Sequence, residues 1–212
     1  MDVHPPHGSV HTWRDFFVHL TIITLGLLIA LGLEGVVELV HDRHLLHHAE
    51  ANLRSELQQN RTILANDEKS LDGSEKQLET YFGLLIAFKK DHRGRGENSL
   101  NWEWNGPSSA AWDTARNTGA VALMDYAAAQ NYADIYAQQS LLDAQASAYI
   151  RDVYRSLAPL LGGRKLSSLQ PAEVDTMIAN VQQTMADLKF LRDLSDTLSR
   201  YYEHGTSFEG NH

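Results

Sequence analysis

Four histidines follow the longest apolar stretch of the chain, and their spacing is suited to chemistry: His41, His44, His47 and His48. His41, His44 and His48 are three and four positions apart, so a helix would place them on one face, with Glu38 one turn earlier. Imidazole and carboxylate groups at this spacing can bind zinc, nickel or copper. Because imidazole titrates near pH 6.5, the group could instead sense protons, or it could simply contact lipid head groups.

A second group of candidate residues lies in the long loop at 91–107 or follows it: Trp102, Trp104, Trp112 and Arg116. Exposed tryptophan and arginine are typical of protein-docking patches and ligand pockets. The same tryptophans could instead pin the loop onto the end of a helical bundle. The sequence leaves both interpretations open.

Several classes of function are disfavoured by composition and by missing motifs. The chain has no cysteine, which excludes thiolate metal sites and cysteine nucleophiles. It contains no phosphate-binding glycine loop, no G-x-S-x-G and no H-E-x-x-H motif. The net charge of −9 disfavours nucleic acid as a partner. We therefore expect a protein that is not an enzyme, with no cofactor and no identified small-molecule substrate.

The elements that must position these residues begin with an apolar segment. Residues 16–33 contain no formal charge, and at 1.5 Å per residue they extend about 27 Å, close to the thickness of the bilayer hydrocarbon. Trp13 is placed where an interfacial aromatic belt would lie. We predict a tail at 1–15 and a transmembrane helix at 16–35. A cleaved secretory signal ending near Ala30-Leu31-Gly32 is the alternative.

One face of the predicted span is distinctive because Gly26, Ala30 and Glu34 recur every four residues. Small residues at this spacing allow helix backbones to approach closely in lipid, where packing drives association. The pattern favours a self-association or partner-docking face. A solitary anchor is the alternative, since glycine is frequent in transmembrane helices.

The rest of the chain has helical periodicity. Residues 36–72 lack glycine and proline and predict a stalk helix with an apolar stripe that Asn60 interrupts. Gly73 is expected to end this helix, and a new helix would follow to about Lys90. After the loop at 91–107 we expect a short helix ended by Gly119, a long helix capped by Asp125, and a last helix that begins with Pro171 and ends at Gly205. The predicted fold is all-α: a single transmembrane helix that continues into a stalk, which completes an antiparallel helical bundle at 73–212.

The stretches LGLLIALGLE, HHAEANLRSELQQNR and AWDTARNTGAVALM resemble a family of uncharacterised bacterial inner-membrane proteins with one N-terminal transmembrane helix and a helical extramembrane domain. The resemblance covers the anchor, the stalk and the short helix with Trp112. It implies an architecture and a bacterial membrane. It implies no activity.

These observations favour a non-catalytic bitopic protein of the bacterial inner membrane, with its bundle in the periplasm. Its expected partners are the lipid bilayer and either other membrane-protein subunits or further copies of itself, so that it would act as an accessory or scaffold subunit or as a homo-oligomer. A sensory or ligand-binding bundle is one alternative. A metal- or haem-binding membrane protein that uses the histidine group is the other.

Overall fold

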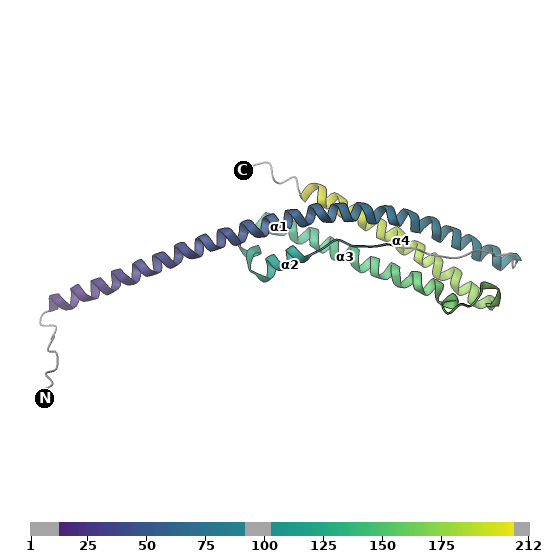
Figure 1. Cartoon of the computed structure of the whole chain (residues 1–212), viewed down its shortest axis with the longest axis horizontal. Coiled ribbons are helices and arrows are strands. Elements are labelled where there is room, and N and C mark those ends of the chain that lie inside the picture. The colour runs from purple at the N-terminus through teal and green to yellow at the C-terminus, as the bar shows by residue number, and fades with distance from the viewer. Residues whose placement is uncertain (1–12, 92–102, 206–212) are drawn as a thin grey trace, which may run out of the picture. The chain divides into compact units, whose positions relative to one another are not determined.

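The computed structural model describes residues 13–91 and 103–205, with side chains up to Glu203. Within these residues all regular elements are helical, which confirms the all-α class (Figure 1). The elements are α1 (Trp13–Asp91), α2 (Ala110–Asn117), η1 (Ala120–Leu123), α3 (Tyr126–Leu157), η2 (Ala158–Leu160), η3 (Leu166–Ser168) and α4 (Pro171–Gly205).

The chain divides into two compact units, Met1–His48 and Ala49–His212. The first unit contains the N-terminal part of α1, whose apolar side chains are exposed all around the helix, including the neighbours Phe16, Phe17 and Val18. By length and composition, α1 is a candidate membrane span, near the N-terminus. It is the one candidate of this kind among the described residues.

In the second unit, α1 buries side chains at alternating intervals of four and three residues from Leu53 onwards. One set of buried positions, seven residues apart, holds only leucine: Leu57, Leu64, Leu71, Leu78 and Leu85. The other set changes character along the helix: Leu53, Asn60, Asp67, Ser74, Tyr81 and Phe88. This repeat of about 3.5 residues is the pattern with which helices pack in coiled coils. The polar members of the second set are therefore exceptions that need partners.

The expected helix end at Gly73 is wrong, because α1 continues through it to Asp91. A glycine in a helix interior costs only about 1 kcal/mol relative to alanine. The buried repeat crosses this position without interruption, from Leu71 to Ser74 and Leu78, so packing outweighs that cost. The predicted stalk and the helix predicted after it are one element.

Ion pairs and hydrogen bonds between helices fix the directions of the three long helices. Contacts of α1 with α4 join Lys89 to Asp175 and Glu68 to Ser195, so these two helices are antiparallel. Contacts of α1 with α3 join residue 56 to residue 136 and residue 81 to residue 156, so α1 and α3 are parallel. Because α1 and α3 are parallel, the chain must return along the bundle between the end of α1 and the start of α3.

Several predicted helix ends are confirmed. Gly119 has a positive φ of 81° after α2, and the Asp125 carboxylate accepts a hydrogen bond of 2.9 Å from the backbone of Ala127 at the start of α3. Pro171 begins α4, and Glu173 in its first turn accepts the N–H of residue 170 at 2.8 Å. Local signals at these positions were sufficient to predict the boundaries.

Candidate functional site

The predicted packing face lies on the first unit. Gly26, Ala30 and Glu34 are all exposed on α1. A Cβ atom placed on Gly26 would meet nothing within 4 Å, so the close approach of another helix at this point would be unobstructed by the described chain. The use of this face for packing stays a prediction.

The four histidines near the end of the first unit are exposed on α1. The rings of His44 and His48 have centroids 6.4 Å apart and planes inclined by 23°. His47 lies 6.2 Å from His48, with its ring inclined by 59°. In the described parts of the chain, no group of three or more His, Asp or Glu side chains is arranged to hold a metal ion, and this applies to the predicted set with Glu38 and His41. The structure therefore offers a pair, His44 and His48.

The predicted tryptophan patch is only partly described, because Trp102 lies outside the described residues. Trp104 and Trp112 are half-buried, and Arg116 is exposed. The indole of Trp112 stacks on the ring of Tyr136, with centroids 5.3 Å apart and planes inclined by 5°. These contacts favour the packing interpretation for the two described tryptophans, whereas docking through their exposed edges stays a prediction.

The backbone that precedes α2 is bound by polar side chains of α1. We call residues 103–109 the strap and the side chains Glu56, Asn60, Asp67 and Ser70 the polar column. The N–H of residue 103 donates to Ser70 Oγ at 3.2 Å, and that of residue 105 donates to Asp67 Oδ1 at 3.1 Å. As the strap advances, its partners move back along α1, so the strap lies antiparallel to α1 and returns the chain to the start of the bundle.

Asp67 is the centre of the polar column, with only 1 % of its surface exposed. Its Oδ1 atom accepts from the backbone and side-chain nitrogens of Asn105 at 3.1 and 3.2 Å, and its Oδ2 atom accepts from the N–H of Gly106 at 3.0 Å. A buried carboxylate is costly unless hydrogen bonds replace its hydration. The turn at Asn105 and Gly106 provides that replacement.

Asn60 and Glu56 hold the next part of the strap. Asn60 forms two hydrogen bonds with the backbone of Ser108, one from its own Nδ2 at 2.7 Å and one to its Oδ1 at 2.8 Å. Glu56 accepts from Ser108 Oγ at 2.9 Å, from the N–H of Ala111 at 2.9 Å and from the hydroxyl of Tyr136 at 2.7 Å. Burial, and after it the hydrogen bond to Glu56, raises the pKa of the Tyr136 hydroxyl above its ordinary value.

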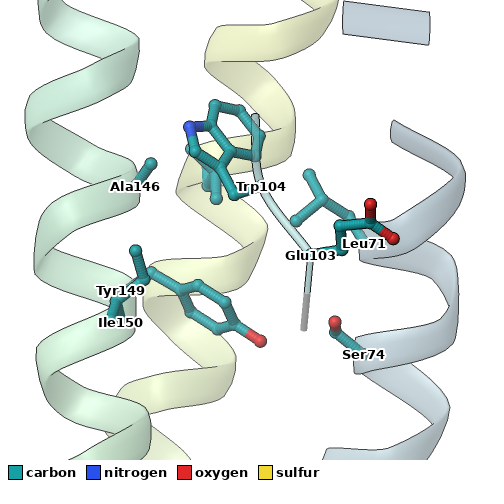
Figure 2. Close-up of a pocket in the computed structure, with 8 residues that line it drawn as sticks. Leu71, Ser74, Glu103, Trp104, Ala146, Tyr149 and Ile150 are labelled. Atoms are coloured by element: carbon teal, nitrogen blue, oxygen red, sulfur yellow. The ribbon is translucent and has the colours of Figure 1, made fainter. Parts of the chain in front are cut away.

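A small pocket lies where Trp104 of the strap meets the three long helices (Figure 2). Its free space is about 10 Å³, enough for about one water molecule. The Tyr149 side chain extends from α3 toward Ser74 on α1 (Figure 2). Burial raises the pKa of the Tyr149 hydroxyl, and the Ser74 side chain offsets part of the increase. This pocket is a packing feature and is too small for a substrate.

Asp143 on α3 borders the turn of the strap. Its Oδ1 atom is 3.1 Å from the position that a Cβ would occupy on Gly106, whose φ is +70°. Loss of solvation, and after it the negative charge of Asp67, raises the pKa of Asp143 from 3.8 to about 6. Asp143 is therefore a carboxyl group that titrates in mildly acidic solution and lies next to the turn and the polar column.

The polar column is not predicted from the sequence, apart from Asn60, which interrupts the apolar stripe. The available signal was the seven-residue repeat of polar residues at Asn60, Asp67 and Ser74 on an otherwise buried face. Such a repeat indicates that a polar partner covers the helix. The identity of the partner was not readable, since the strap lies 38 and 48 residues further along the chain from Asp67 and Asn60.

Because its acceptors are occupied by the chain's own N–H and O–H groups, the polar column binds the strap and offers its carboxylates to nothing else in the described structure. The arrangement positions a backbone segment and does not by itself form a reaction centre. In comparisons with known proteins, the chain matches no family model, no curated protein and no solved structure.

Proposed function

We propose that this chain is a non-catalytic single-pass membrane protein that acts through contacts, as an accessory or scaffold subunit of a bacterial inner-membrane assembly or as a homo-oligomer. The observation that supports this proposal most directly is the exposed apolar surface of α1. Side chains on all sides of the segment are about half or more exposed, from Phe16 to Val40. A helix that is apolar all around needs to be covered by lipid or by protein.

The polar side chains within the segment support a lipid environment. His19 Nδ1 lies 2.7 Å from the carbonyl oxygen of Asp15, and Thr21 Oγ1 donates to the carbonyl oxygen of Phe17 at 2.8 Å. Polar groups in a bilayer need partners inside the protein, and these two find them on their own helix. Trp13, Phe16 and Phe17 form an aromatic cluster at the N-terminal end, with ring centroids 5.0–5.7 Å apart, as expected for an interfacial belt.

Association through Gly26 and Ala30 can be tested by adding bulk to this face. We expect Gly26→Ile or Ala30→Ile to reduce the size of the native complex that is purified in mild detergent, because the larger side chain separates the helices. Gly32→Ile is the matched control, since Gly32 lies on roughly the opposite side of the helix from Ala30 and a Cβ there also meets nothing within 4 Å.

Mass spectrometry of the purified complex would distinguish a homo-oligomer from a hetero-complex by the chains that it contains. An unchanged complex size in both face variants would contradict the packing role. A chain that is purified as a monomer in every mild detergent would contradict the scaffold proposal as a whole.

The orientation of the bundle can be tested independently, because the chain has no cysteine of its own. Ser168→Cys introduces a single thiol at an exposed position between α3 and α4. If the bundle lies in the periplasm, a membrane-impermeant maleimide added to intact spheroplasts should label this thiol as completely as it does in lysed cells. Labelling only after lysis would place the bundle in the cytoplasm.

A further inference from the structure

The polar column of the second unit binds the chain's own strap, but the pair of imidazoles at the end of the first unit is exposed. His44 and His48 are four residues apart on α1, so they lie one turn apart on the same face. Their ring centroids are separated by 6.4 Å, and the ring planes differ by 23°. Because both residues are exposed, their side chains can rotate so that one nitrogen of each ring is aimed at a common point.

Two imidazoles at this spacing on a helix are a known arrangement for a metal ion, because one face presents both nitrogens to the same ligand position. Neutral imidazole nitrogen suits zinc, copper and nickel and does not suit calcium or magnesium, which prefer oxygen. His47 is a neighbour of His48 in sequence, and adjacent residues diverge around a helix. The 59° inclination of the His47 ring to that of His48 agrees with this divergence.

We propose that His44 and His48 form a two-imidazole site for one divalent transition-metal ion, next to the C-terminal end of the candidate span. The ion would take its remaining ligands from water, since no third His, Asp or Glu in the described residues is arranged to complete the site. Such a site is open and exchangeable. Copper should bind more tightly than nickel or zinc, following the general order for nitrogen ligands. The proposal does not depend on association of the helix in the membrane.

The test uses the full-length protein in detergent, after removal of metals with a chelator, and the copper complex of iminodiacetate as the probe. This complex retains free positions that two imidazoles can fill together, and electron paramagnetic resonance reports the coordinated nitrogens. We expect His44→Ala and His48→Ala each to reduce the copper bound by one ion per chain. The double variant should bind no less copper than either single variant, because both residues belong to one site.

His47→Ala is the matched control, since it removes an exposed imidazole from the same turn and leaves the pair intact. The chain contains 11 histidines, so the variants and not the total copper content locate the site. Loss of an ion in His47→Ala, additive losses in the double variant, or no loss in either single variant would overturn the assignment. All three residues are exposed, so these substitutions should leave the fold intact, and circular dichroism of each variant checks the helix content.

Discussion

At the scale of the residue, the fold depends on a few buried polar side chains that hold the strap. Asp67→Asn tests the most buried of them. The amide replaces one acceptor oxygen with a donor, so either Asn105 or Gly106 loses the partner of its N–H group. A buried donor without an acceptor costs about 1–3 kcal/mol. We expect the free energy of unfolding, measured by urea titration with circular dichroism, to fall by about that amount.

Glu79→Gln is the control for this substitution, because Glu79 is on the same helix but exposed. An exposed substitution away from special features usually changes stability by no more than about 0.5 kcal/mol. Equal effects of the two substitutions would show that the hydrogen bonds of Asp67 to the strap contribute nothing specific.

Asp143 leads to a prediction of pH dependence. Its pKa is raised from 3.8 to about 6 in the folded chain, so the folded state binds more protons than the unfolded state between these values. Stability from this group is therefore greatest in acid and is lost as the pH rises through about 6. Asp143→Asn should remove this dependence and stabilise the protein at pH 7–8, by about 1 kcal/mol or less because the side chain is partly screened by solvent.

The measurement for Asp143 is the difference in free energy of unfolding between the variant and the original protein at pH 5 and at pH 8. This difference cancels the contributions of the other carboxylates. It should be larger at pH 8. A difference that is constant with pH would mean that Asp143 titrates alike in both states.

At the scale of the element, the length of α1 is determined by packing and not by local propensity. Gly73→Ala is expected to stabilise the protein by about 0.4–1 kcal/mol, because alanine favours the helix and restricts the unfolded chain. A Cβ at this position meets nothing within 4 Å, so no clash opposes the gain. Thermal unfolding should shift upward. A decrease would indicate that the helix is broken or bent at Gly73 in solution.

Gly106→Ala is the contrasting prediction for the strap. The φ of +70° costs a residue with a side chain about 1–2 kcal/mol, and the new Cβ would lie 3.1 Å from Asp143 Oδ1 and 3.2 Å from Trp104 Nε1. We expect a loss of at least about 1 kcal/mol in the free energy of unfolding. An unchanged stability would mean that the turn does not adopt this conformation.

The elements also show how far sequence reasoning extends. The ends of α2, α3 and α4 were predictable because glycine, aspartate and proline act within a few residues of where they lie. The apolar stripe of the predicted stalk was predictable from helical periodicity, which also acts over a few residues. The parallel arrangement of α1 and α3 was not predictable from the sequence. It depends on the continuation of α1 through Gly73 and on side chains that bind a backbone segment about 40 residues away.

In the molecule as a whole, the two units differ in the exposure of their apolar side chains, which are exposed in the first unit and form a buried core in the second. The buried side chains of α1 begin at Leu53, and all those of α3 and α4 belong to the second unit. Among the described residues of the first unit no side chain is buried, and the apolar side chains from Phe16 to Val40 are exposed. The fold of the bundle should therefore be independent of the candidate span.

This independence predicts that a fragment of residues 49–212 is soluble and folded without detergent. We expect a helical far-UV spectrum and a single cooperative transition in urea, because the leucine repeat of α1, the strap and the pair α3 and α4 are all retained.

The full-length chain should remain with the membrane after an alkaline wash, whereas the fragment should be found in the supernatant. A fragment that aggregates or lacks a cooperative transition would show that the bundle needs the first unit for its stability. A full-length chain released by the wash would show that the exposed apolar segment is covered by protein and not by lipid.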